Sequence, residues 1–208
     1  MNRAVFLDRD GVLNVDVGYT WRLHDLSVPE DVPGALSRLS SAGFKLVVIT
    51  NQSGVARGKF GLKDVEAFHQ ALQAHISRLN GPKIDAWMTC PHHPEGSVAP
   101  FNVACECRKP GIRLITDASA QLQIDVTKSF LIGDKWSDIL CGRRAGAQTL
   151  LVQDPKSLSY ALPENVRISS QADAGGRKVR IASATETGPV EIHSSLSSAV
   201  ERVVSWPD

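Results

Sequence analysis

Two aspartates stand one residue apart near the start of the chain. The apolar run Ala4–Leu7 leads into Asp8, Arg9 and Asp10, and side chains at i and i+2 near a strand end point to the same side. One carboxylate can attack phosphorus when a cation screens its charge, and a second can donate and then accept the proton. An isolated Asp-x-Asp is also common in capped turns, so both interpretations stay open for the pair alone.

Three further groups that phosphoryl transfer requires follow in order along the chain. Thr50 offers a hydroxyl, and the backbone N–H groups after it can hold phosphate oxygens. Lys109, preceded by Arg108, offers a cation to offset phosphate charge. Asp134 can complete a site for Mg²⁺, which prefers oxygen ligands. Four matched elements in one order favour a phosphatase site over a capped turn.

A second cluster contains cysteine and histidine. Cys90 and His92 form one close pair, and Cys105 and Cys107 form another, which is the Cys₃His ligand set of a closed, structural Zn²⁺ site. The loop between the pairs has too little apolar surface to order itself, so a metal would stabilise it. The alternative is three buried or free thiols beside a surface histidine. His93 is a possible substitute ligand, although the Cys-x-His spacing favours His92.

The zinc loop leads directly into the two basic residues, so a bound zinc would hold both of them over a substrate. Of the four cysteines, three crowd into this one segment, which is not how a disulfide framework is spread.

The elements that must position these residues alternate between apolar runs and amphipathic stretches. We expect strands over about 4–7, 44–49, 84–88, 129–132 and 148–152, and helices over about 32–42, 62–80, 111–122 and 137–145. This alternation predicts an α/β fold with a Rossmann-like parallel sheet and helices on both faces. Ligands of such sheets bind beyond the carboxyl ends of the strands, which is where each polar cluster falls.

The rest of the chain is harder to interpret. Residues 154–193 have weak periodicity, with candidate edge strands over 179–182 and 190–193, and a last amphipathic helix is expected around Leu196 and Val200. We expect one domain over 1–208, with a motif-bearing core over 4–152 and an extension over 154–208. The chain between Asp10 and Phe44 is too short for a helical cap domain, so an open site is expected.

Composition limits the classes of binding partner that we expect. The net charge of +1 gives no electrostatic reason to expect nucleic acid or an anionic membrane. No apolar stretch approaches the roughly 20 residues that span a bilayer, and the apolar run near Met1 is too short for a signal peptide. We therefore expect a cytoplasmic protein, and a monomer, whose partner is a small phosphorylated metabolite.

Four segments together resemble the haloacid dehalogenase superfamily, and more narrowly its branch of heptose bisphosphate phosphatases and histidinol-phosphatases. They are Phe-Leu-Asp-Arg-Asp-Gly-Val-Leu-Asn (6–14), Thr-Asn-Gln-Ser-Gly-Val-Ala-Arg-Gly (50–58), Cys-Arg-Lys-Pro (107–110) and Gly-Asp-Lys-Trp-Ser-Asp (133–138). The resemblance covers roughly residues 4–152. Related phosphatases carry a zinc loop with this Cys-x-His and Cys-x-Cys arrangement, which supports the zinc assignment.

The resemblance implies a role for each matching residue. Asp8 would be the nucleophile and Asp10 the general acid and base. Asp8, the backbone carbonyl of Asp10 and Asp134 would bind Mg²⁺. Thr50 and Lys109 would hold the transferring phosphoryl group. The implied substrate contacts are Asn51, Gln52, Ser53 and Arg108, with a flap made of Asp16, Val17, Gly18 and Tyr19.

The resemblance leaves two candidate substrates. The Arg-Lys pair and the Thr-Asn-Gln-Ser stretch favour the 7-phosphate of a D-glycero-D-manno-heptose 1,7-bisphosphate, and histidinol phosphate is the nearest competitor. Gly111 follows Pro110 directly, where relatives often have intervening residues. The position in which the loop holds its two basic residues is therefore left open. An alternative of a different class is a catalytically silent zinc-loop binding module, which the retained carboxylates and lysine disfavour.

Overall fold

One mixed sheet runs through the computed structural model, which describes residues 1–153, 163–172, 178–185 and 187–206. Its strands are β1 (Ala4–Leu7), β2 (Lys45–Asn51), β3 (Ala86–Cys90), β4 (Phe130–Gly133), β5 (Gln148–Val152), β6 (Arg167–Ala172), β7 (Lys178–Ala184) and β8 (Gly188–His193). Across the sheet they lie in the order β3-β2-β1-β4-β5-β8-β7-β6. The strands from β3 to β8 pair in parallel, and β7 and β6 add an antiparallel ribbon.

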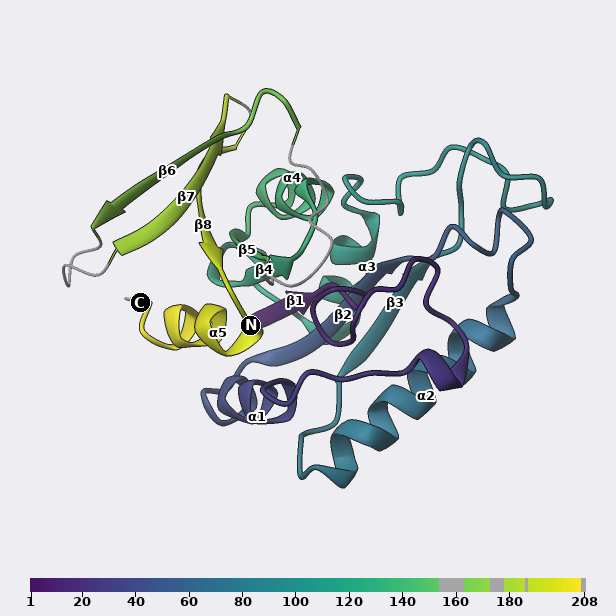
Figure 1. Ribbon diagram of the computed structural model, residues 1–208, viewed down its shortest axis with the longest axis horizontal. Coiled ribbons are helices and arrows are strands. Elements are labelled where there is room, and N and C mark those ends of the chain that lie inside the picture. The colour runs from purple at the N-terminus through teal and green to yellow at the C-terminus, as the bar shows by residue number, and fades with distance from the viewer. Residues whose placement is uncertain (154–162, 173–177, 186, 207–208) are drawn as a thin grey trace.

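Helices cover both faces of the parallel part (Figure 1). The helices are α1 (Val32–Ser41), α2 (Leu62–Arg78), α3 (Arg113–Leu122), α4 (Trp136–Ala145) and α5 (Leu196–Val204). α1, α2 and α5 lie on one face, and α3 and α4 lie on the other. The predicted α/β sheet with helices on both faces is confirmed.

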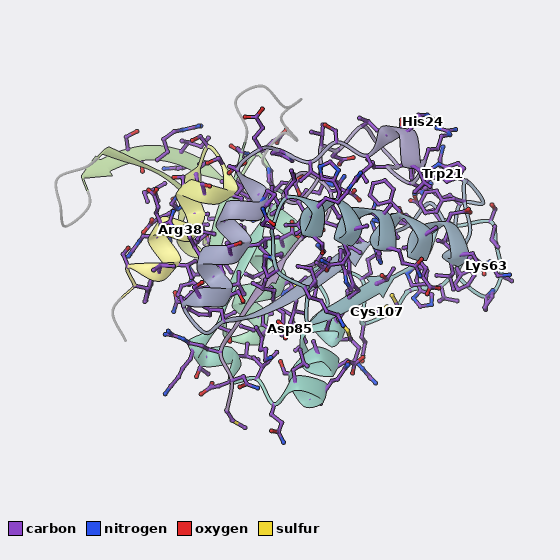
Figure 2. The ribbon with its side chains drawn as sticks, turned by 90° about the horizontal axis from the view of Figure 1, so that it is seen from below. Trp21, His24, Arg38, Lys63, Asp85 and Cys107 are labelled. Carbon is purple, nitrogen blue, oxygen red and sulfur yellow. The ribbon has the colours of Figure 1, made fainter. Side chains whose placement is uncertain are left out.

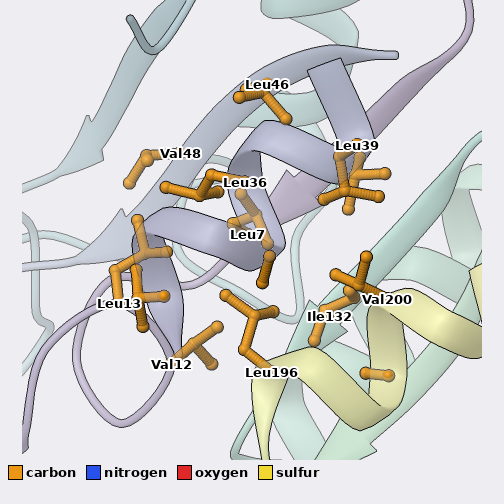
Figure 3. Packing of buried hydrophobic residues seen from close by; sticks show 14 of the residues in the cluster. Leu7, Val12, Leu13, Leu36, Leu39, Leu46, Val48, Ile132, Leu196 and Val200 are labelled. Atoms are coloured by element: carbon orange, nitrogen blue, oxygen red, sulfur yellow. The ribbon is translucent and has the colours of Figure 1, made fainter. Parts of the chain in front are cut away.

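The strand β1 shows why the two faces are apolar. All four of its residues are fully buried, as expected for a parallel strand covered on both sides. Val5 and Leu7 belong to the core cluster beneath α1 and α5, whereas Ala4 and Phe6 belong to the cluster beneath α3, because side chains alternate along a strand. Figure 3 shows the first cluster, with side chains of α1 and α5 meeting those of the sheet.

The last strands differ from the expected arrangement. Strands do form near 179–182 and 190–193, but neither is an edge: β8 pairs with β5 and β7, and β7 lies between β8 and β6. The edge strand on this side of the sheet is β6, which the weak periodicity did not predict. Residues 154–162, 173–177 and 186 of the expected extension lie outside the described residues.

Loops without a helical cap domain follow the strands β1 and β3, which lead into the polar clusters. Between β1 and α1 the only helical element is a three-residue 3₁₀ turn, and residues 91–112, between β3 and α3, contain none; both segments are described throughout. None of the helices in the described part of the chain combines the length and apolar character needed to cross a bilayer. Figure 2 places Trp21, His24 and Lys63 at the end of the molecule opposite Arg38.

Candidate active site

A buried lysine lies between two carboxylates beyond the carboxyl ends of β1 and β4. Lys109 Nζ is 2.9 Å from Asp8 Oδ1 and 2.7 Å from Asp138 Oδ1, and it donates a 2.8 Å hydrogen bond to the carbonyl of Ile49. Burial by itself would lower the pKa of Lys109, but the charges of Asp138 and Asp8 outweigh burial and hold that pKa above its ordinary value. The lysine is therefore a fixed cation beside Asp8.

A third carboxylate completes an acidic group. Oxygens of Asp8, Asp134 and Asp138 lie within 4.8 Å of one another, and Asp134 Oδ1 is buried with no hydrogen-bond partner. Burial, followed by the negative charge of Asp8, raises the pKa of Asp134 to about 8. A buried oxygen without a partner, and a carboxylate that resists ionisation among its neighbours, both fit a site built for a cation.

Gly11 makes this close approach possible. Its backbone has φ +83°, and a Cβ at this position would collide with the carboxylate of Asp134. Glycine adopts such a conformation without strain. The oxygen-only donor set suits Mg²⁺, which takes carboxylates together with water and phosphate oxygens.

Asp10 is held by three neighbouring side chains. Arg9 donates to both of its oxygens, from Nε to Oδ1 at 3.0 Å and from Nη2 to Oδ1 and Oδ2 at 2.8 Å each. Asn14 Nδ2 donates to Oδ1 at 3.0 Å, and Gln52 Nε2 donates to Oδ2 at 2.8 Å. The Asp10 side chain is 13% exposed, so a fixed carboxylate still reaches the surface.

The end of β2 and the turn after it contribute supporting contacts. Thr50 is buried, and its Oγ1 accepts a 2.8 Å hydrogen bond from Gln52 Nε2. Asn51 uses its side-chain amide on the backbone of Lys109: Nδ2 donates to the carbonyl at 3.1 Å, and Oδ1 accepts from the N–H at 3.0 Å. Ser53 lies half-buried in the following turn. These contacts fix Lys109 relative to β2.

The loop that carries the basic residues also has a defined shape. Arg108 Nη1 is buried without a hydrogen-bond partner, and the Arg108 carbonyl accepts a 2.7 Å hydrogen bond from the N–H of Gly111. A Cβ at Gly111 would collide with the carbonyl of Glu106. The glycine directly after Pro110 is therefore required by this tight turn.

The segment expected to form a flap, Asp16–Tyr19, contacts the loop after β4. Asp16 Oδ2 is 3.2 Å from Lys135 Nζ, and Asp16 Oδ1 accepts a 2.9 Å hydrogen bond from Gly18 N–H. The Tyr19 ring lies 4.4 Å from Lys59 Nζ in a cation–π contact. Val17 is 58% exposed. The flap tip thus presents side chains to solvent while its base is tied to the loop after β4.

The cysteine and histidine residues converge at the end of β3. The Sγ atoms of Cys90, Cys105 and Cys107 are 3.1–3.6 Å apart, and Cys107 Sγ is 3.2 Å from His92 Nδ1. These separations are far longer than a disulfide bond and close to the roughly 3.6–3.8 Å between ligands of a tetrahedral Zn²⁺. The group can hold a metal ion. His93 is outside it and contacts Arg57 instead.

Two residues of the site were not singled out from the sequence. Arg9, between the two aspartates, is fully buried against Asp10, and Asp138 pairs with Lys109. Asp138 also accepts the N–H of Lys135 at 3.0 Å, so its position three residues into α4 indicates helix capping as readily as a role in the site.

Comparison with known proteins places the chain in a family. A model described as HAD-hydrolase-like matches residues 106–167. The chain is 38% identical over 158 residues to a D-glycero-beta-D-manno-heptose-1,7-bisphosphate 7-phosphatase of Haemophilus ducreyi, covering 76% of this chain and 86% of that protein. A protein of the same name from Rhodopseudomonas palustris is 42% identical over 143 residues, covering 69% and 79%.

A solved structure agrees with these relatives. The D,D-heptose 1,7-bisphosphate phosphatase from B. bronchiseptica, in complex with magnesium and phosphate, has a TM-score of 0.73 and 26% identity, covering 97% of this chain and 98% of that one. A HAD-like phosphatase from Mesorhizobium loti has a TM-score of 0.76 at the same identity, covering 98% and 86%. The chain therefore belongs to the haloacid dehalogenase-like hydrolases, in the family of the heptose bisphosphate phosphatases, and is a phosphoric monoester hydrolase.

Proposed function

We propose that this enzyme removes the 7-phosphate of D-glycero-beta-D-manno-heptose 1,7-bisphosphate through a phosphoryl-enzyme intermediate on Asp8. The observation that carries the mechanism is the buried group in which Lys109 pairs with Asp8 and Asp138 beside the unpartnered oxygen of Asp134. The substrate follows from the relatives that share 38–42% identity and that name. The same relatives favour the heptose substrate over histidinol phosphate.

In the first step, an Asp8 oxygen forms a bond to phosphorus while the bond from phosphorus to the sugar oxygen breaks. Lys109 and Arg108 offset the charge on the phosphoryl oxygens, and Thr50 donates to one of them. Asp10 gives its proton to the departing sugar oxygen. Its partly exposed carboxylate, held in place by Gln52, supports this role.

In the second step, water attacks phosphorus and the bond to Asp8 breaks, which releases inorganic phosphate. Asp10, now ionised, accepts the proton of the water, so the same carboxylate serves both steps and returns to its starting state. The contacts from Arg9 and Gln52 keep that carboxylate in place between steps.

Mg²⁺ would be held by Asp8, Asp134 and the backbone carbonyl of Asp10, where it would screen the charge between the phosphate and the nucleophile. The raised pKa of Asp134 and its unpartnered Oδ1 support this assignment. We expect Asp134→Ala to weaken magnesium binding sharply, measured by titration calorimetry, while the fold is kept. Unchanged magnesium affinity in Asp134→Ala would remove Asp134 from the ligand set.

Zn²⁺ would be held by Cys90, His92, Cys105 and Cys107, and it would serve a structural role because four protein ligands leave no position for water.

We also assign residues 1–208 to one domain, since β5 and β8 pair directly and α5 packs on the shared core.

The decisive test is a phosphate-release assay with magnesium over a small panel. The panel contains the beta and alpha anomers of the heptose 1,7-bisphosphate, and histidinol phosphate. We expect the beta anomer to be hydrolysed with the highest kcat/KM, and phosphorus NMR to show loss of the 7-phosphate with the 1-phosphate kept. Faster hydrolysis of histidinol phosphate would overturn the substrate assignment.

A further inference from the structure

The arginine between the two aspartates is the largest fully buried side chain of the described residues. Its guanidinium lies 4.6 Å from the centre of the Phe68 ring. Transferring a cation from water into the interior costs free energy unless hydrogen bonds replace the lost hydration. Arg9 obtains such bonds from Asp10 through Nε and Nη2, whereas its Nη1 is buried without a hydrogen-bond partner.

The same guanidinium contacts the base of the flap. Arg9 Nη2 also donates a 2.6 Å hydrogen bond to the carbonyl of Thr20. Thr20 in turn faces the flap, because its Oγ1 accepts from Val17 N–H at 3.1 Å and lies 3.4 Å from Asp16 Oδ1. One planar group thus joins the carboxylate of Asp10 to the segment Asp16–Tyr19.

These contacts require a planar guanidinium, which arginine has and lysine lacks. A guanidinium presents several N–H groups in one rigid plane, so it can hold both oxygens of a carboxylate and a third acceptor at once, whereas an ammonium acts as a single point. Asn14 and Gln52 each contact only one oxygen of Asp10, so neither can fix the plane of the carboxylate alone.

We propose that Arg9 is a positioning residue that sets the orientation of the Asp10 carboxylate and couples it to the flap. The inference rests on the proposed role of Asp10 as acid and base, and it adds a residue that acts through Asp10 without touching the substrate. Displacing a reacting group by about 1 Å is enough to lower a rate by roughly 10²-fold.

The test is Arg9→Lys with two substrates, the heptose bisphosphate and p-nitrophenyl phosphate. Nitrophenolate leaves without needing a proton, so a misplaced Asp10 spares formation of the phosphoryl-enzyme from this substrate and slows only its hydrolysis. We expect a burst of about one nitrophenolate per enzyme followed by a roughly 10²-fold slower steady state. With the heptose bisphosphate both steps slow and no burst appears. General distortion of the site would slow both substrates without a burst.

Asp10→Asn is the reference, and Arg113→Lys, on the exposed surface of α3, is the matched control with unchanged kinetics. Because Arg9 acts through Asp10, the double variant Arg9→Lys, Asp10→Asn should be no slower than Asp10→Asn alone. If Arg9→Lys does not fold, Arg9→Gln is measured in its place, and failure of both to fold would assign Arg9 to stability and overturn the inference.

The remaining outcomes separate this inference from the proposed function. Wild-type kinetics in Asp10→Asn would overturn the acid and base role itself. A burst in Asp10→Asn together with wild-type kinetics in Arg9→Lys would overturn only the inference about Arg9. Full additivity of the two substitutions in the double variant would do the same.

Discussion

At the scale of single residues, the proposed chemistry depends on the nucleophile that Lys109 holds. Asp8→Asn keeps the shape of the side chain, and Lys109 keeps its 2.7 Å contact with Asp138, so the fold should survive. An amide is a poor nucleophile and a poor magnesium ligand. We expect turnover to fall to the trace that deamidation allows, measured by phosphate release, while Asp117→Asn on the exposed face of α3 keeps full activity. Sustained turnover in Asp8→Asn would contradict the intermediate on Asp8.

His69 carries a pH dependence of stability. It lies buried on α2, and its ring stacks on Trp87 at 4.6 Å between centroids. Burial, and next the positive charge of Arg9, lowers the pKa of His69 to about 3. The His69 imidazole therefore binds a proton near pH 6.5 in the unfolded chain, whereas in the folded chain it stays neutral until the pH falls to about 3. The stability this histidine gives is present above about pH 6.5 and is lost as the pH falls towards about 3.

His69→Gln should therefore flatten the fall in stability between pH 6.5 and about 4, by an amount on the order of a few kcal/mol. Urea unfolding at a series of pH values measures the slope. The matched control is His24→Gln, because the His24 side chain is 75% exposed and its replacement should leave the slope unchanged. Equal slopes for wild type and His69→Gln would show that His69 does not couple folding to protonation.

Sequence alone predicted the residues whose chemistry and spacing form a pattern. Asp8 and Asp10 follow a buried strand at i and i+2, and the structure brings Asp8 together with Lys109 and Asp134 from distant loops. The roles of Arg9 and Asp138 depend on burial and on contacts across the fold. Their spacing fits an exposed turn or a helix cap equally well, so no pattern distinguished them.

At the scale of elements, the zinc loop links β3 to the basic residues. Its two ligand pairs end at Cys107, directly before Arg108 and Lys109, and Asn51 holds the Lys109 backbone from the neighbouring strand β2. Loss of one ligand should free the loop and misplace both cations, whose proposed phosphate contacts would depend on fixed geometry. The sheet itself should remain folded, because the cluster beneath α1 and α5 contains none of the four ligands, and in the cluster beneath α3 Cys107 is only a partly buried neighbour.

We expect wild type to retain roughly one equivalent of zinc. We expect Cys107→Ala to lose this zinc, to raise KM and to lower kcat together. Magnesium should not replace the lost zinc, because it prefers oxygen ligands to thiolates. Elemental analysis and steady-state kinetics measure both effects. Cys141→Ala serves as the control for zinc content, because Cys141 is a buried cysteine of α4 outside the cluster and its Sγ lies 3.2 Å from the Gly111 carbonyl. Wild-type kinetics in a zinc-free Cys107→Ala protein would show that zinc in the loop does not position Arg108 and Lys109.

Element prediction succeeded where burial on both faces leaves a continuous apolar run, and where apolar residues recur at helical spacing. The strands β1 and β4 and the helix α2 fall within one or two residues of the expected bounds, which is the usual uncertainty at element ends. The strand β6 escaped prediction because its sequence, Arg-Ile-Ser-Ser-Gln-Ala, has no apolar run. Its place in the sheet is set by pairing with β7, which a local pattern does not record.

At the scale of the whole molecule, the C-terminal part shares the core of the motif-bearing part. The strand β8 pairs in parallel with β5, and Leu196 and Val200 of α5 pack in the cluster that contains Leu7 of β1 and Leu36 of α1 (Figure 3). The N–H of Ser197 also donates a 2.9 Å hydrogen bond to Asp31 Oδ2, at the start of α1. Residues beyond the catalytic motifs therefore support the strand that positions Asp8.

This shared core predicts that damage to α5 lowers the stability of the active site. Leu196→Ala should cost about 2–5 kcal/mol, because Leu196 is 2% exposed and its loss leaves a cavity. For a chain of this size each kcal/mol lowers Tm by roughly 2–4 °C. Far-UV circular dichroism and residual phosphatase activity should shift by the same interval, whereas Val204→Ala, at a position 44% exposed on the same helix, should change neither. A separate early transition that leaves the temperature of activity loss unchanged would mean that the C-terminal part folds as its own unit, against the single domain proposed for residues 1–208.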